Sequence, residues 1–182
     1  MVKNTIVQFV GFATNLDADR FISDWDGYAK KEMHKKYEPV LLQQLPQTKH
    51  KFRFISQHEW PDTDVRLSFK NQKRSAYFPD QSVQIIQIGG YMPVQFKKGN
   101  PDKDGDTRVL AFVGHNENDL DFYRQLPNHN RLNIYQAYYE SCAYGYVMEF
   151  FLKEKDITPL LVSLKQRSGV ETAVYSECLV EH

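Results

Sequence analysis

Histidine and glutamate side chains at strand ends and on strand faces are the groups in this sequence best suited to chemistry. His115 follows Gly114 at the end of an apolar run and precedes a polar stretch, residues 116–119. A strand end beside a helix start is a common place for a polar site, and a histidine there can act as a general base or a metal ligand. The alternative is a surface turn in which Asn118 or Asp119 caps the next helix, and a lone histidine favours that simpler interpretation.

His58 belongs to a strand-like run in which every second residue points the same way. One face of this run carries Phe52, Phe54, Ser56, His58 and Trp60. In the same manner, one face of a later hairpin carries Gln136, Tyr138, Glu140 and Cys142. If both faces line the interior of a barrel, they form a mixed aromatic and polar cavity that suits a small, partly polar ligand, and Tyr91 can join it. The alternative is that both faces are the solvent side of an antiparallel sheet.

The sequence therefore offers a small set of candidate site residues. The candidate catalytic residues are His58, His115 and Glu140, and the candidate ligand-binding residues are Trp60, Tyr91, Gln136 and Tyr138. Glu149 lies on the strand next to that of Glu140, and paired carboxylates can serve acid–base catalysis when burial separates their pKa values. Alternation through the hairpin does not decide whether these two carboxylates face each other.

No metal or cofactor motif is present in the sequence. Residues 102–106 resemble the start of a calcium-binding loop, but Thr107 stands where glycine is needed and Val113 where a bidentate glutamate is needed. Motifs for phosphate, dinucleotide and zinc binding are absent, as is a nucleophile elbow. The sequence thus predicts neither a bound metal nor a cofactor.

The elements that must position these residues are predicted from apolar periodicity and from Gly, Pro and capping residues. In the first half we expect a strand over 4–13, a helix beginning at Asn15 or Asp17, a short helical turn over 40–45, strands over 50–60, 65–69 and 83–96, and an irregular stretch over 71–81. In the second half we expect strands over 108–114, 132–142, 144–153 and 170–180, with helices over 118–126 and from Asp156 to Gly169. Gly89 and Gly90 within a strand indicate a bulge or a sharp bend.

The two halves of the sequence share a similar pattern of residues. Residues 9–12 (Phe-Val-Gly-Phe) and 112–115 (Phe-Val-Gly-His) both end an apolar strand at a glycine, before a polar turn and an acidic helix start. We interpret residues 108–182 as a complete strand–helix–strand–strand–helix–strand unit and residues 1–98 as a degenerate copy of it. Residues 99–107, charged and rich in Gly and Pro, are the predicted linker between units that pack as one compact domain.

Two strands of the second unit are apolar on both faces. Residues 108–113 and 146–152 lack the polar alternation that a sheet with one wet face should show. Helices must therefore cover one face of this sheet. The simplest cover for its other face is the sheet of the other copy. A second chain is the alternative, which is one reason to expect a homodimer.

This pattern resembles the ferredoxin-like fold, and its doubling resembles the α+β barrel proteins in which two such sheets pair within a tandem chain or across a dimer. The expected fold class is therefore α+β, with two ferredoxin-like βαββαβ units whose antiparallel sheets pack as an α+β barrel or sandwich. The resemblance implies relatives such as cofactor-independent monooxygenases, polyketide cyclases, small-lactone isomerases and haem-binding proteins. It does not fix a function, because this fold carries many.

Composition narrows the class of partner. Hydrophobic residues make up 41% of the 182, enough for a real core, and 23 basic residues balance 23 acidic ones, so no global field attracts nucleic acid or an anionic membrane. No stretch approaches the roughly 20 apolar residues of a membrane helix, and the start of the chain does not resemble a signal peptide. With two distant cysteines, Cys142 and Cys178, we expect reduced thiols and a cytoplasmic location.

Three functions from different classes remain. The first is a small-molecule site inside an α+β barrel, catalytic or not. The second is RNA recognition: residues 109–116 and 143–147 resemble two motifs of an RNA-recognition module, although Glu149 replaces an aromatic residue, Cys142 replaces a basic one, and the chain is neutral. The third is a structural or regulatory domain that dimerises through its sheet.

Overall fold

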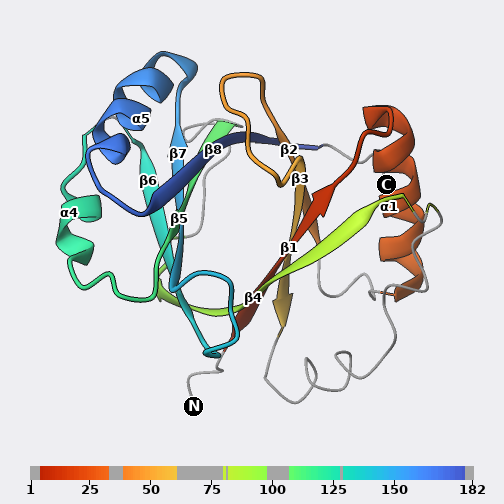
Figure 1. The fold of residues 1–182 in the computed structure, drawn as a ribbon, viewed down its shortest axis with the longest axis horizontal. Helices are drawn as coiled ribbons and strands as arrows, with labels where there is room; N and C mark the ends of the chain where they lie inside the picture. Colours follow the sequence, from red (N-terminus) through yellow and green to blue (C-terminus); the bar gives the residue numbers. More distant parts are fainter. Residues whose placement is uncertain are drawn as a thin grey trace.

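The computed structural model of the protein describes residues 5–32, 39–60, 80, 82–97, 107–127 and 129–178. Within these ranges eight strands close into an antiparallel barrel with the order β1-β3-β2-β8-β5-β7-β6-β4, and helices lie outside it (Figure 1). The strands are β1 (Ile6–Ala13), β2 (Val40–Gln44), β3 (Phe54–Trp60), β4 (Gln84–Gln95), β5 (Thr107–Val113), β6 (Arg131–Ala137), β7 (Tyr146–Leu152) and β8 (Val170–Glu177). The helices are α1 (Ala18–Glu32), α4 (Leu120–Arg124) and α5 (Ile157–Lys165), with a 3₁₀ turn, η3 (Glu154–Asp156).

The ring of strands repeats one order. Four neighbours run β4-β1-β3-β2 and the next four run β8-β5-β7-β6, so that each half places its strands in the same sequence. The halves join at two seams, where β2 pairs with β8 and β4 pairs with β6. Because both seams lie within one chain, the inner face of each half is covered by the other half. A second chain is not needed to cover either face.

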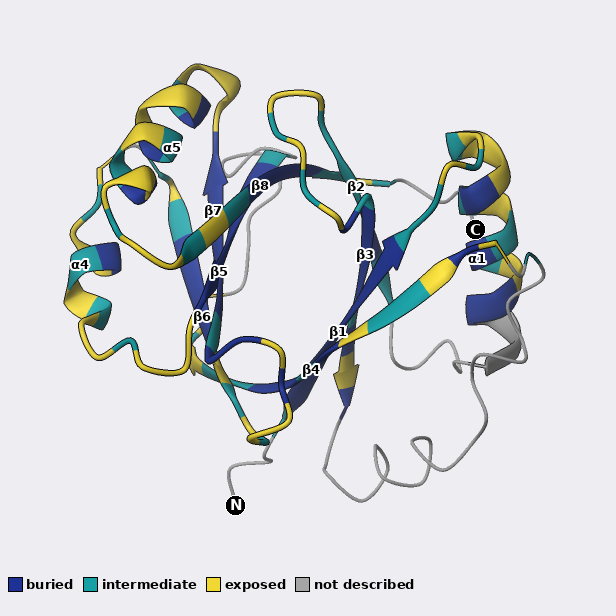
Figure 2. Ribbon diagram, viewed as in Figure 1, coloured by how far each residue is buried: buried dark blue, intermediate teal, exposed yellow. Residues whose placement is uncertain are grey.

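Two-sided burial on β5 confirms the expectation drawn from its apolar sequence. Val109, Ala111 and Val113 pack outward in a cluster with side chains of α4 and α5. Leu110 and Phe112 point the other way, into the barrel. Figure 2 shows the result: the strands are largely buried, whereas the outer sides of the helices are exposed.

Helix α1 covers the outside of the first half. Its start is capped by Asp17, whose Oδ1 accepts hydrogen bonds from the backbone N–H of Asp19 (3.0 Å) and Arg20 (3.3 Å), as predicted. Phe21 of this helix stacks on Phe54 of β3, with 4.1 Å between ring centroids. No helix among the described residues is long and apolar enough to cross a membrane.

One predicted element is wrong. Residues 40–45 were expected as a short helical turn, but Val40–Gln44 is strand β2. The physical reason is that Leu41 packs outward and Leu42 inward, while the backbone pairs with β3 and β8. Periodicity alone cannot assign so short an apolar run.

Other predicted boundaries shift, and some predictions fall outside the described residues. The strand expected over 132–142 ends at Ala137. The strand predicted over 65–69 lies outside the described residues, as do the irregular stretch over 71–81 except Asp80 and the linker over 99–107 except Thr107.

The predicted bulge in β4 is present. Phe9 pairs with Gly89 while Val10 pairs with Gln87, which leaves Ile88 as an extra residue, and Gly89 has a φ of +140° that favours glycine. The Cys142 thiol lies against this bulge, 3.2 Å from the carbonyl oxygen of Gly90. Cys142 and Cys178 are both free, as expected.

Two glycines give a matched test of packing against the inner face. An alanine methyl at Gly11 would overlap the ring of Phe52, whereas a methyl at Gly27, on α1, meets no atom within 4 Å. We expect Gly11→Ala to lower the free energy of unfolding by about 1–3 kcal/mol through overpacking. Gly27→Ala should raise it by about 0.5–1 kcal/mol because alanine favours helix. Urea denaturation of both variants checks this, and equal effects of one sign would contradict the packing described for Gly11.

Candidate functional site

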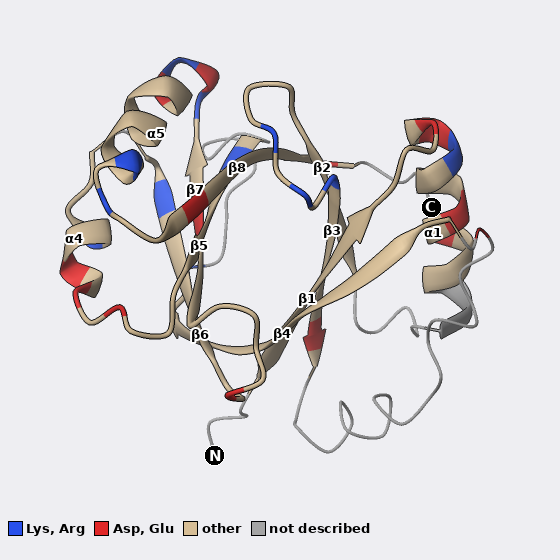
Figure 3. Ribbon diagram, in the orientation of Figure 1, with Lys and Arg blue, Asp and Glu red and all other residues tan. Residues whose placement is uncertain are grey.

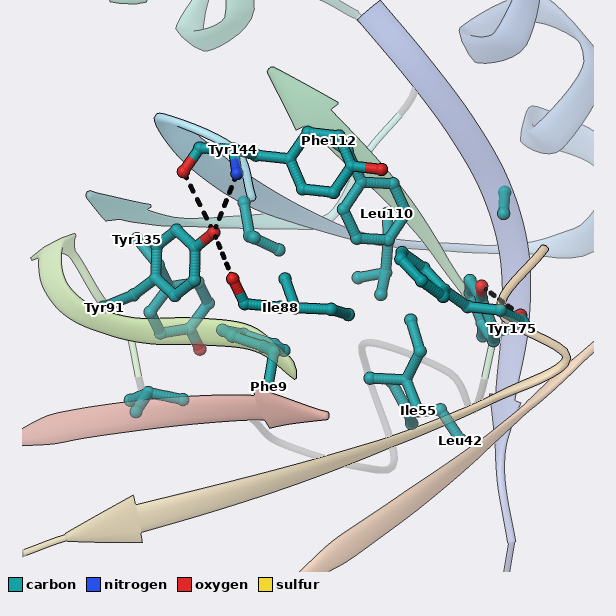
Figure 4. Packing of buried hydrophobic residues seen from close by; sticks show 14 of the residues in the cluster. Phe9, Leu42, Ile55, Ile88, Tyr91, Leu110, Phe112, Tyr135, Tyr144 and Tyr175 are labelled. Carbon is teal, nitrogen blue, oxygen red and sulfur yellow. Dashed lines mark hydrogen bonds between the residues drawn. The ribbon is translucent and has the colours of Figure 1, made fainter. Parts of the chain in front are cut away.

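Aromatic and aliphatic side chains from both halves fill most of the barrel interior (Figure 4). Phe9 lies edge-on to Tyr91 and Tyr135, with ring centroids 5.6 and 5.3 Å apart. The Tyr91 hydroxyl donates a hydrogen bond to the backbone carbonyl of Tyr144 (3.0 Å), and burial raises the pKa of this phenol well above its ordinary value. This part of the interior is packed mainly with apolar and aromatic side chains.

One end of the interior is different, because charged and amide side chains meet there. We call this group the polar cluster: Gln57, Arg108, Asn133, Tyr135, Glu149 and Glu177. They come from five strands, β3, β5, β6, β7 and β8. Figure 3 shows that charged residues otherwise gather on helices and loops, while most of the strand ribbon is uncharged.

Strand alternation explains why these side chains point inward. Arg108 lies two residues before Leu110, and Glu149 lies two residues after Val147, both members of the inner cluster. Glu177 follows the inner residue Tyr175 by two positions in the same way. Pairing then places Arg108 beside Phe151 of β7 and Tyr175 of β8, within reach of carboxylates on both neighbouring strands.

An ion pair forms the centre of the polar cluster. Arg108 Nη1 lies 2.7 Å from Glu149 Oε2, and its Nη2 lies 2.8 Å from Glu177 Oε2. The second oxygen of Glu149 accepts hydrogen bonds from the Tyr135 hydroxyl (3.2 Å) and from the Asn133 amide (3.4 Å). Burial, and then the Glu149 charge, raise the pKa of Tyr135 well above its ordinary value, so that its phenol stays protonated and donates.

A further hydrogen bond crosses the barrel. Gln57 of β3 donates to the Tyr135 hydroxyl of β6 at 3.3 Å, which links the first half of the ring to the second. Tyr135 thus accepts one bond and donates another, and each fixes its position.

The polar cluster runs from the solvent to the interior. Glu177 is the last residue of β8, and 40% of its side chain is exposed. Arg108 is 6% exposed and Glu149 only 1%. The Phe151 ring lies between two guanidinium groups, with Arg108 Cζ 4.7 Å and Arg131 Cζ 3.5 Å from its centroid. An aromatic wall with a buried cation therefore lies beside a partly exposed carboxylate.

The chemistry of this arrangement is recognition of a polar group by a fixed cation. Glu149 has both oxygens engaged, so it orients Arg108 rather than offering an open acceptor. The Nε of Arg108 is buried without a hydrogen-bond partner in the structure. A buried donor without a partner is costly, and it is the natural place for an acceptor atom of a ligand.

The strand face that carries His58 and Trp60 does not line the interior. It shares the side of Phe54, which packs against α1, so it is the outer face of β3, although His58 and Trp60 are buried. His58 Nε2 lies 2.8 Å from Ser56 Oγ, and Trp60 Nε1 donates to Gln8 (3.0 Å). Ile55 and Gln57 occupy the inner face instead.

The remaining candidates are scattered. Gln136 is exposed because it lies on the outer face of β6, opposite to Tyr135, and Tyr138 and Glu140 are exposed beyond the end of that strand at Ala137. His115 lies in an exposed turn, where its Nε2 is 2.9 Å from the backbone carbonyl oxygen of Cys142. Among the predicted site residues, all of which the structure describes, Tyr91 alone lies in the interior.

Most of the polar cluster is not apparent from the sequence pattern. Glu149 is a candidate there as a neighbour of Glu140, whereas in the structure it pairs with Arg108. A signal was present: Arg108 begins the run Arg-Val-Leu-Ala-Phe-Val, and Glu149 interrupts Tyr-Val-Met-Glu-Phe-Phe-Leu. A charged residue is rarely buried unless it is paired, so one charge of each sign in neighbouring apolar strands predicts a buried pair.

The acidic residues that follow His115 have structural roles, as hydrogen-bond acceptors and as a helix cap. Glu117 accepts hydrogen bonds from Arg167 Nη2 (2.7 Å) and from the Tyr123 hydroxyl (2.7 Å). The Arg167 guanidinium holds the pKa of Glu117 at about 2, below its ordinary value of 4.5. Asp119 caps α4 through the backbone N–H of Phe122 (3.1 Å), as predicted.

The two tyrosines that an RNA-recognition sheet would expose, Tyr144 and Tyr146, are not displayed together on an open sheet face. Tyr144 is buried and packs inside the barrel against Phe112, with 5.0 Å between ring centroids, and Tyr146 is only half-exposed on the outer face. Such modules stack bases on exposed aromatic side chains. The aromatic residues of the inner sheet face therefore cannot serve in that way.

The residues that the structure describes do not fit a histidine-bound haem or a metal cluster. Among the described residues no group of His, Cys, Asp and Glu could hold a metal ion. Of the described histidines, His50 contacts the interior rings, stacking on Phe112 at 5.1 Å. Its Nε2 lies 2.9 Å from Glu171 Oε1, and its Nδ1 accepts the N–H of Phe52 (3.2 Å), so neither ring nitrogen is available as an axial ligand.

Known structures share this barrel. No family model and no curated protein matches the sequence. An anthrone oxidase-like protein matches with a TM-score of 0.61 and 9% identity over 97% of this chain and 92% of that one. Two mutant chlorite dismutases from Candidatus Nitrospira defluvii also match at 9% identity. One, in complex with cyanide, has a TM-score of 0.60 over 98% and 92% of the two chains, and the other has 0.57 over 98% and 93%.

These structural neighbours belong to the ferredoxin-like α+β barrel superfamily. At 9% identity the likeness shows the fold alone. The chain is thus an α+β protein whose closed eight-stranded antiparallel barrel is the one seen in anthrone oxidase-like and chlorite dismutase-type proteins.

The buried pair makes a strong prediction for stability. Glu149→Leu leaves Arg108 charged and buried with only the partly exposed Glu177 beside it, so we expect the free energy of unfolding to fall by about 3 kcal/mol. The double variant Arg108→Met/Glu149→Leu should recover most of that loss, because it removes both charges. Asp80→Asn, which breaks the exposed Arg20–Asp80 pair, is the control and should barely shift the midpoint. A double variant as unstable as Glu149→Leu would contradict this account.

The lowered pKa of Glu117 predicts a pH dependence. In the unfolded chain this carboxyl takes up a proton near pH 4.5, whereas in the folded protein it stays charged down to about pH 2. Its contribution to stability is therefore complete above pH 4.5 and is lost as the pH falls toward 2. We expect Glu117→Gln to flatten the acid side of the stability profile, measured by urea unfolding at several pH values. Parallel profiles for the variant and the wild type would contradict the pairing with Arg167.

Proposed function

We propose that this chain binds a small organic molecule at the polar end of its barrel interior. The observation that carries the proposal is the Arg108–Glu149 ion pair, which lies inside the barrel and is connected to solvent through Glu177. A buried charge pair is weak support for stability, since apolar residues of similar volume often serve as well or better. A recognition role accounts for its position at the solvent end of the interior.

We further infer that the two halves of the barrel are ferredoxin-like βαββαβ units, the first one degenerate. The repeated strand order, β4-β1-β3-β2 and β8-β5-β7-β6, supports this, as do the structural neighbours. A tandem barrel of this kind brings side chains from both units into one interior. The hydrogen bond between Gln57 and Tyr135 is such a contact.

If the ligand is also a substrate, the polar cluster supplies a fixed positive charge and a hydrogen-bond donor. Arg108 carries the charge, and Tyr135, a protonated phenol because its pKa is raised, is the donor. Chemistry of the cofactor-independent monooxygenase, cyclase or isomerase type would use such groups. The anthrone oxidase-like neighbour supports a search among aromatic compounds first.

Native mass spectrometry of the protein from its expression host, compared with the denatured sample, tests the proposal. We expect the wild type to carry a small added mass that denaturation releases. The Arg108→Met/Glu149→Leu variant, which lacks both charges, should lose that mass, and Glu154→Gln, an exposed residue outside the polar cluster, should keep it. The same spectra report whether the chain is a dimer, as predicted from its sequence.

Two outcomes would contradict the proposal. One is an added mass that the double variant retains, because the molecule would then bind elsewhere. The other is a bare wild-type protein whose melting temperature no member of a panel of small aromatic compounds raises. In that case a bare dimer would favour the structural or regulatory domain instead.

A further inference from the structure

One edge of the Arg108 guanidinium is only half used. Nη1 is committed to Glu149 inside the barrel. The opposite edge presents Nε and Nη2 side by side, and of these Nη2 binds Glu177 at 2.8 Å while Nε is buried without a partner. Two parallel donors on one edge of a guanidinium match the two oxygens of a carboxylate. Glu177 satisfies only one of them.

We propose that this edge of Arg108 is the head-group site for a small organic carboxylate, and that Glu177 occupies it as an internal competitor when no ligand is bound. The assignment rests on the proposed function and names its ligand class. The bound carboxylate takes both Nε and Nη2 and displaces Glu177 into solvent. No bond is made or broken in this exchange.

Charge favours a monoanion such as a carboxylate over a dianion. Within the polar cluster one arginine faces two glutamates, so an exchange of one carboxylate for another keeps the local balance unchanged. A dianion such as phosphate would bring an additional negative charge close to Glu149, which is 1% exposed and therefore weakly screened. Glu177 also demonstrates that a carboxylate oxygen fits beside Nη2.

Glu177 is able to leave at low cost, whereas Arg108 is not. The Glu177 side chain is 40% exposed at the end of β8, so its charge is hydrated as soon as it turns outward. Partly exposed ion pairs contribute little to stability. Arg108 stays in place because Glu149 holds Nη1 and because its guanidinium lies over Phe151 at 4.7 Å.

The surroundings indicate an apolar, aromatic body behind the carboxylate. Arg108 pairs with Tyr175 on one side and with Phe151 on the other, and Tyr135 lies across Glu149 from it. Aromatic side chains bind flat apolar rings well, because offset or edge-on ring pairs add to the area buried. Benzoate is the simplest molecule with both parts.

A matched pair of probes tests the assignment: 4-fluorobenzoate and the neutral 4-fluorobenzamide, titrated with the wild-type protein and followed by fluorine NMR. We expect the acid to bind at least about 10-fold more tightly than the amide, since a charge-assisted bidentate pair is replaced by a neutral contact. Glu177→Gln removes the competing charge and should tighten binding of the acid by about 3- to 10-fold.

Control variants distinguish the contact with the two parallel donors of Arg108 from a general effect of charge. Glu154→Gln removes the same charge from an exposed position outside the polar cluster and should leave the affinity for the acid within about twofold, because exposed charges are screened by salt. Arg108→Lys keeps the positive charge but loses the two parallel donors, so binding of the acid should weaken by about 10-fold or more. Circular dichroism checks that this variant is folded, and Glu177→Gln tests the proposal independently of it.

The outcomes distinguish this inference from the proposed function. Equal binding of acid and amide, or an affinity for the acid that Glu177→Gln leaves unchanged or weakens, overturns the carboxylate site. The proposed function survives that result if native mass spectra still carry a mass that depends on the Arg108–Glu149 pair. Failure of both probes to bind, together with bare native protein, overturns both.

Discussion

Closure of the sheet within one chain is the constraint on which the rest of the structure depends. The two seams, β2 with β8 and β4 with β6, leave no free edge in the ring and give every strand an inner face. That face must be filled by side chains, which explains why β5 and β7 are apolar on both sides. It also explains the close approach at Gly11, where the Phe52 ring takes the space that a side chain would need.

The same closure requires that polar residues inside the barrel find their hydrogen-bond partners there. A charged side chain inside a barrel must find its partners there, because water does not reach the packed centre. Glu149 does so with Arg108, Tyr135 and Asn133, which come from two neighbouring strands. The result is a fixed cation whose orientation is decided by strand register rather than by a flexible loop. A site built on strands holds its geometry more firmly than one built on loops.

Most of the described strands and helices, the bulge at Gly89 and the two-sided burial of β5 could be predicted from the sequence, because each depends on local pattern or on apolar content. The short strand β2 could not, and was expected as a helical turn. The site could not, because it depends on which face of a strand turns inward. On β3 both faces are largely buried, so alternation alone does not distinguish His58, on the outside, from Gln57, on the inside. On the hairpin, β6 ends at Ala137, before the residues that were expected to share a face with Gln136. The charges at Arg108 and Glu149 were a better guide than any histidine.

The charged residues of the polar cluster differ in how far each is exposed to solvent. From Glu177 through Arg108 to Glu149, exposure falls from a side chain 40% in contact with solvent to a residue 1% exposed. The innermost charge is the one with the most hydrogen bonds, and the outermost is the one that water can satisfy if it turns away. This gradient in exposure gives the two glutamates different roles toward Arg108, which one glutamate could not fill alone. Glu149 fixes the arginine, and Glu177 leaves its outer edge open to exchange.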